Sequence, residues 1–106
     1  MSKKVKTATD ILEEMAATHR QRNVIYKDNN KLVGAVMVAM FPEGVVLKSA
    51  NDFNRWHNFE LIVIKLTRFA NSGLLHKDSI RDAGVYAAIV ESFTNKNSKP
   101  IKGNRP

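Results

Sequence analysis

The sequence predicts an all-α fold, a four-helix bundle-like single domain with flexible basic ends. Four stretches with the length and apolar content of helices are separated by short polar or turn-forming segments. Two of them follow capping-box spacing, in which a Ser or Thr lies three residues before an Asp. A chain of 106 residues suits one domain with a modest core. We divide it into a basic arm (1–6), a helical domain (7–93) and a basic disordered tail (94–106).

The first two helices have clear boundary signals. The first is expected to begin near Thr7, which has capping-box spacing to Asp10, and to end at the turn-rich segment 27–30. The second, about 31–41, is apolar almost all round and stops at Pro42, because proline disfavours helix in the residue before it. A helix of this kind must be buried.

The third helix is expected over about 50–71, with a second capping box at Ser49 and Asp52. It ends at "NSG", where Asn71 or Gly73 takes the left-handed conformation that closes a helix. The segment "FPEGVVLKS" is expected as a connection with a short extended piece at "VVL". Strand competes with helix for the β-branched runs "VVL" and "LIVI", and continuous capped spans favour helix. Because the second and third helices are both so apolar, we expect a homo-oligomer formed through them.

The net charge of +7 belongs to the ends of the chain. Residues 7–93 contain ten Lys or Arg and ten Asp or Glu, so the excess lies in the arm and the tail. These ends would give weak, salt-sensitive contact with nucleic acid, and no groove-reading motif accompanies them. The chain has no cysteine and no signal-peptide pattern, and its longest apolar run is half the roughly 20 residues of a membrane span. A cytoplasmic protein without a membrane partner is expected.

Charged residues on the apolar third helix are the first candidates for a site. Glu60, Lys65 and Arg68 share one side of it, and unpaired charges are costly to bury there. The fourth helix, about 79–93, should pack antiparallel beside it and carries Asp78 and Asp82 one turn apart near its start.

Two interpretations of these charges remain open. One is a structural ion-pair network of Lys65 and Arg68 with Asp82, in which Asp78 or Ser79 caps the fourth helix. The other is a polar pocket in which cations bind phosphate and carboxylates bind Mg²⁺, which commonly uses one or two carboxylates together with substrate phosphates.

Other candidates lie outside these two helices. His76 precedes the first turn of the fourth helix, where it would contact a phosphate or remain a solvated loop residue. Arg20, Arg22 and Lys27 form a basic cluster with Tyr26 after the first helix, either as solvated surface or as the second cationic wall of a cleft.

Three segments give the chain a resemblance to a known group of proteins. They are "RQRNVIY", "DFNRWHNFELIVIKLTRFA" and "HKDSIRDAGVYAA". Together they resemble small, mostly phage-encoded helical proteins related to the nucleotide-modification-associated and MazG-like nucleotide pyrophosphohydrolases. The resemblance implies an oligomeric all-α protein, in the host cytoplasm if phage-encoded, that holds nucleotide phosphates and Mg²⁺ between facing helices. The chain departs from the MazG-like acidic motifs: Glu13 and Glu14 lack a third glutamate, and Val63 follows Glu60 where an Asp is expected.

Two functions follow from this pattern, one enzymatic and one not. The first is a Mg²⁺-dependent nucleotide phosphohydrolase. The second is a non-catalytic phage accessory protein that sequesters a nucleotide signal or binds and inhibits a host protein. The candidate residues are Asp78, Asp82 and Glu60 for the metal, Lys65, Arg68, Arg22 and His76 for phosphates, and Tyr26 and Tyr86 for the base or ribose.

Overall fold

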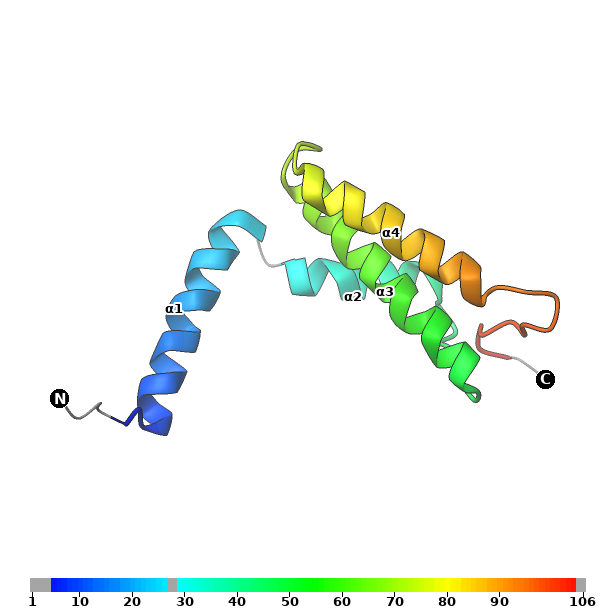
Figure 1. Ribbon diagram of the computed structural model, residues 1–106, viewed down its shortest axis with the longest axis horizontal. Helices are drawn as coiled ribbons and strands as arrows, with labels where there is room; N and C mark the ends of the chain where they lie inside the picture. The colour runs from blue at the N-terminus through cyan, green and yellow to red at the C-terminus, as the bar shows by residue number, and fades with distance from the viewer. Residues whose placement is uncertain (1–4, 27–28, 105–106) are drawn as a thin grey trace.

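The protein is all-α, as the sequence predicts (Figure 1). The computed structural model describes residues 5–26 and 29–104, apart from the side chains of Ile25, Tyr26 and Asn30. Its helices are α1 (Ala8–Tyr26), α2 (Asn29–Met40), α3 (Ala50–Asn71) and α4 (Lys77–Phe93). Among the described residues, no helix combines the length and the apolar character needed to cross a membrane.

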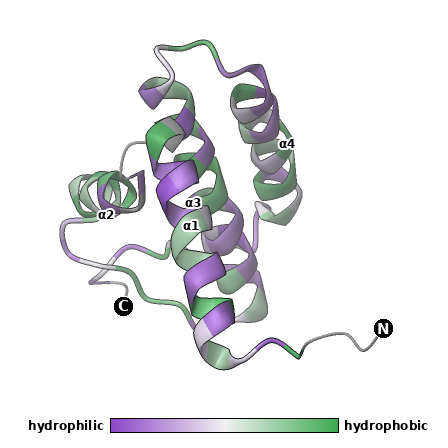
Figure 2. Cartoon of the chain, turned by 90° about the vertical axis from the view of Figure 1, so that its left-hand side faces the viewer, coloured by the Kyte–Doolittle hydropathy of each residue, from purple (hydrophilic) through white to green (hydrophobic). Residues whose placement is uncertain are grey.

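The central helix is α3, which packs extensively on α4 and less extensively on α2. Figure 2 shows α2 and α4 on opposite sides of α3. Val63 of α3 and Ala83 of α4 are the buried hydrophobic residues of the described chain. Beside α2, the rings of Phe41, Trp56 and Phe59 form an aromatic cluster, with the Phe41 ring centroid 5.2 Å from that of Trp56 and 5.9 Å from that of Phe59. The sequence-based assignment of "LIVI" to helix is confirmed, since it lies within α3.

The first helix stands away from this three-helix body. α1 touches α3 only slightly, and Figure 1 shows it projecting from the rest of the chain. The radius of gyration is 18.2 Å, whereas a compact chain of this length has about 13 Å. The molecule is elongated and measures 61 × 33 × 25 Å. This shape leaves much of α1 without a core to pack on.

Both predicted capping boxes are present. At α1 the amide of Asp10 donates to Thr7 Oγ1 at 3.1 Å, and the amide of Thr7 donates to Asp10 Oδ2 at 2.9 Å. At α3 the amide of Asp52 donates to Ser49 Oγ at 3.0 Å, and Asp52 Oδ2 accepts from the amide of Ser49. Local sequence thus fixes both helix starts.

The turn between α3 and α4 closes one helix and opens the next. Gly73 adopts φ +75°, as expected for one of the two candidates there, and its amide donates to the carbonyl of Ala70. The amide of Leu74 donates to the carbonyl of Phe69, which completes a Schellman motif. The expected start of α4 at Asp78 or Ser79 is wrong: the helix begins at Lys77, with His76 as the N-cap.

The C-terminal segment is paired with the loop between α2 and α3. Residues 95–104 return to the loop between α2 and α3, where the amide of Val46 donates to the carbonyl of Ile101 at 2.7 Å. The amide of Gly103 donates to the carbonyl of Gly44 at 2.8 Å. Backbone hydrogen bonds thus join this segment to the loop although its composition favours disorder, and the predicted division into helical domain and tail stays a prediction. Residues 105–106 lie outside the described part of the chain.

A buried ion pair anchors this return. Asp52 accepts a hydrogen bond from Arg55 at 3.0 Å, and both side chains are largely buried. Arg55 also donates to Asn51 Oδ1 and to the carbonyl of Lys99. One arginine thus joins the start of α3 to the C-terminal segment.

Candidate functional site

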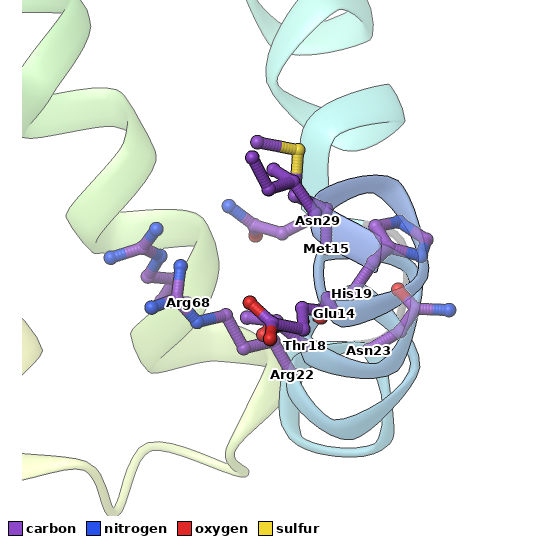
Figure 3. Close-up of a pocket in the computed structure, with 9 residues that line it drawn as sticks. Glu14, Met15, Thr18, His19, Arg22, Asn23, Asn29 and Arg68 are labelled. Carbon is purple, nitrogen blue, oxygen red and sulfur yellow. Dashed lines mark hydrogen bonds between the residues drawn. The ribbon is translucent and has the colours of Figure 1, made fainter. Parts of the chain in front are cut away.

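An open groove of about 770 Å³ separates α1 from α3. Figure 3 shows one wall built from α1 and the other from α3, with the start of α2 at its end. The lining residues are Ile11, Glu14, Met15, Thr18, His19, Arg22, Asn23, Asn29 and Arg68. The groove exists because α1 leaves the body at an angle and does not pack along it.

Two arginines from distant parts of the sequence meet in this groove. Arg22 extends from α1 toward α3, where Arg68 lies, and His19 stands one turn before Arg22 (Figure 3). Glu14 lines the same wall and forms an ion pair with Lys6, Nζ to Oε1 2.9 Å, on the surface. Arg22 of the predicted basic cluster lies within α1 and lines the groove, and its role in binding phosphate stays a prediction. Arg20 is exposed and does not line the groove, and Lys27 lies outside the described residues.

A side-chain amide contact lies at the end of the groove, where α2 starts. Asn71 Nδ2 at the end of α3 donates to Oδ1 of the buried Asn29 at 3.2 Å. A hydrogen bond to a buried amide offsets the cost of removing it from water. This contact joins the end of α3 to the start of α2, where Asn29 lines the groove.

Lys65 points toward α4, whereas Arg68 lines the groove beside α1. The lysine Nζ lies 3.1 Å from Oδ2 of Asp82, between α3 and α4. The lysine side chain is 19% exposed and the aspartate side chain 45% exposed. The structural interpretation is confirmed for this pair, since Asp82 balances a lysine on the neighbouring helix.

The three proposed metal ligands are not gathered into one set. Asp78 is exposed in the first turn of α4, Glu60 is half-buried on α3, and Asp82 is engaged by Lys65. In the part of the chain that the structure describes, no group of three or more His, Cys, Asp or Glu side chains is placed to hold a metal ion. The assignment of Asp78, Asp82 and Glu60 to Mg²⁺ stays a prediction.

The remaining predicted site residues lie away from the groove or outside the description. His76 Nδ1 is 2.6 Å from Oγ of the buried Ser79, so its ring contacts the first turn of α4. Tyr86 is half-buried on α4 and does not line the groove. Tyr26 ends α1, but its side chain lies outside the described residues. Their assignments to phosphate and base stay predictions.

Sequence reasoning missed several groove residues on α1 and α2. The missed residues include Glu14, Thr18, His19 and Asn29. No local pattern in the sequence shows how far α1 lies from α3, so none predicts that these residues line a groove. A partial signal was present: Glu14, Thr18 and Arg22 recur at four-residue intervals and therefore share a face. That periodicity identifies a polar wall but not what it faces.

Comparisons with protein-family models, with curated proteins and with solved structures found no match for this chain.

Proposed function

We propose that this protein binds a small phosphorylated ligand, a nucleotide, in the groove between α1 and α3. The observation that carries the proposal is that Arg22 and Arg68 line one groove although they belong to different helices. Guanidinium groups bind phosphate oxygens through paired charge-assisted hydrogen bonds. His19 adds an imidazole ring to the same lining.

The rest of the lining suits the uncharged part of such a ligand. Ile11 and Met15 offer apolar surface toward the N-terminal half of α1, whereas Arg22 lies in its C-terminal half. Thr18 lies between Met15 and Arg22 along α1, and Asn23 follows Arg22; both side chains have hydrogen-bonding groups. Binding sites for small molecules typically combine apolar walls with a few polar groups in this way.

Binding without turnover is the form of the proposal that the geometry supports best. The Lys65–Asp82 pair removes one carboxylate from the expected metal set, and multi-metal phosphohydrolysis requires a cluster of ligands. A non-catalytic accessory protein that sequesters a nucleotide is consistent with the resemblance noted in the sequence. Any Mg²⁺ in the groove would then be carried by the phosphates of the bound nucleotide.

The test compares two arginines of α1. Arg22→Gln removes a groove cation, whereas Arg20→Gln removes an exposed cation that does not line the groove. Calorimetry against a panel of nucleoside mono-, di- and triphosphates, with and without Mg²⁺, should show at least about a tenfold loss of affinity for Arg22→Gln. Arg20→Gln should bind as the parent does.

Two results would count against the proposal. Equal affinities for the two variants would remove the groove from consideration. Release of a dephosphorylated product from the parent protein would replace the binding protein with an enzyme.

A further inference from the structure

A second cleft lies at the other end of α3 from the groove. It has a volume of about 490 Å³ and is bounded by the start of α3 and the C-terminal segment. Its lining residues are Lys48, Ser49, Asn51, Asp52, Asn95, Asn97, Ser98 and Lys99. None of them lines the groove, and Ser49 is roughly 28 Å from Arg68 along the helix axis at 1.5 Å per residue. The two hollows are therefore separate sites.

The C-terminal segment forms one wall of this cleft through defined contacts. Asn51 Nδ2 donates to the carbonyl of Phe93 at 2.9 Å, and Ser98 Oγ donates to the same carbonyl at 3.1 Å. Arg55 donates to the carbonyl of Lys99. Figure 1 shows the segment, orange to red, beside the end of α4 and the start of α3. The backbone of Lys99 is therefore held at the edge of the cleft.

The cleft and the segment beside it are positively charged. Lys48 and Lys99 line the cleft and are exposed, and Lys96 and Lys102 are exposed elsewhere on the segment. Residues 94–104 contain no Asp or Glu. The segment's lysines recur at three-residue intervals, which span up to roughly 10 Å each in an extended chain. Cations spread in this way suit a ligand whose negative charge repeats along its length.

The nearby carboxylates do not cancel this charge. Asp52 is buried in the lining, where Arg55 lies 3.0 Å from its Oδ1 and the amide of Lys48 donates to its Oδ2. Glu43 and Glu91 do not line the cleft. An anion that enters the cleft therefore meets lysine ammonium groups, whereas the carboxylate of the lining is already compensated.

The chemistry of this surface distinguishes among polyanionic partners. Protein interfaces are depleted in lysine and enriched in aromatic residues and methionine, and helices that bind membrane surfaces insert apolar side chains. Within residues 42–48 and 94–104, the structure exposes no large apolar side chain. The rest of the lining consists of asparagine amides and serine hydroxyls beside Asp52. Such groups donate to the phosphate and sugar oxygens of nucleic acids.

An exposed aromatic ring follows the cleft on α3. Phe53 is 54% exposed and lies one helical turn after Ser49, so the two residues share a face. Proteins that bind single-stranded nucleic acid combine a positively charged groove with aromatic side chains on which bases stack. Bases in a duplex are already paired and stacked on each other, so they cannot use such a ring.

We propose that this surface binds single-stranded nucleic acid without reading its sequence. Lys48 and Lys99 contact phosphates at the cleft, Lys96 and Lys102 contact phosphates farther along the strand, and Phe53 stacks on a base. This assigns a defined surface to the nucleic-acid contact that the basic ends of the chain lead us to expect. Because the cleft shares no residue with the groove, its test does not depend on the nucleotide proposed there.

Fluorescence anisotropy with a labelled oligothymidylate of about 20 nucleotides tests the lysines. At about 50 mM salt, Lys48→Gln and Lys99→Gln should each weaken binding about fivefold. The combined variant should reduce the slope of log affinity against log salt by about 1.4. Lys77→Gln is the matched control, because it removes an exposed lysine at the far end of α4. It should bind as the parent does, and a loss equal to that of Lys99→Gln would assign the binding to net charge and overturn the proposed surface.

Phe53→Leu tests the contact with bases. Leucine keeps an apolar side chain but removes the ring, so affinity should fall at least about fivefold while the salt slope stays unchanged. A duplex of the same length should bind more weakly than the single strand and should not respond to Phe53→Leu. Unchanged affinity of Phe53→Leu, or equally tight binding of heparin, would make this a general polyanion surface and overturn its assignment to single strands. Absence of binding by the parent at about 50 mM salt would overturn the proposal as a whole.

Discussion

α1 and α3 begin with capping boxes of the same design, yet they occupy different environments. The Thr7–Asp10 box lies on the surface of a helix that hardly touches the body. The Ser49–Asp52 box lies at the base of the central helix, where Asp52 is 3% exposed. There Asp52 also accepts from the amide of Lys48 and pairs with Arg55.

The comparison shows that a local motif decides where a helix starts, but its surroundings decide how much it stabilises the protein. In water an exposed cap competes with solvent for the same hydrogen bonds. At a buried cap, loss of the carboxylate leaves a cation and several amides without compensation. The C-terminal half of the molecule should therefore dominate its unfolding.

The largest expected effect comes from removing the carboxylate of the buried box. Asp52→Ala should lower the free energy of unfolding by about 3 kcal/mol or more, because Arg55 would stay buried without its partner. The matched variant Asp10→Ala should cost about 1 kcal/mol. Chemical denaturation of both variants measures the difference. Equal losses would mean that burial adds nothing to the cap.

A smaller effect is expected from deleting residues 95–106. The deletion removes the backbone pairing of Val46 with Ile101 and the hydrogen bond from Arg55 to Lys99. At about 1 kcal/mol for each of a few net hydrogen bonds, we expect Tm to fall by roughly 10 °C. A melting curve identical to that of the full chain would show that the segment does not hold the body.

Gly103→Ala is a point-substitution form of the same test. A Cβ at Gly103 would collide with the backbone carbonyl of Glu43, whereas one at Gly84 of α4 meets nothing within 4 Å. Gly103→Ala should therefore loosen the segment and lower stability. Gly84→Ala should raise stability by about 0.5–1 kcal/mol, because alanine favours a helix interior. A stabilising Gly103→Ala would contradict the docked arrangement.

The smallest expected effect comes from breaking the ion pair between Lys65 of α3 and Asp82 of α4. Asp82→Asn removes an ion pair that is partly open to solvent, so it should cost no more than about 1 kcal/mol. Asp78→Asn, on the exposed first turn, should cost less. Isothermal titration should show that both variants keep the nucleotide affinity of the parent, with or without Mg²⁺. A steep loss of nucleotide affinity in either variant, seen only with Mg²⁺ present, would support the predicted metal site.

Most of the fold could be predicted because its signals are local. Thr7, Ser49 and Gly73 each act on backbone groups within a few residues, so their positions mark helix ends directly. The start of α4 was placed wrongly because Asp78 suits a cap by type, whereas His76 occupies the capping position without a side-chain cap bond. Residue preference alone does not distinguish an N-cap from the first turn.

The candidate site could be predicted only in part. Arg22 and Arg68 could be recognised as cations of interest, and so could Lys65 with Asp82. The sequence could not show that Arg68 and Lys65 point to different neighbours, because their separation of three residues places them on the same side of one helix. Only the positions of α1 and α4 around α3 decide which cation faces which helix.

The sequence by itself determined four helices and two capping boxes, since helix formation depends on spacing and on hydrogen bonds between near neighbours. The tertiary structure decided three other features: the outward position of α1, the groove beside it and the return of residues 95–104 to the loop before α3. The return depends on contacts between segments far apart in the chain, whereas the first two features arise because α1 makes few such contacts. Backbone amides and carbonyls make many of the contacts of the return. Because almost every residue carries these groups, no residue type in the sequence predicts which segments will pair.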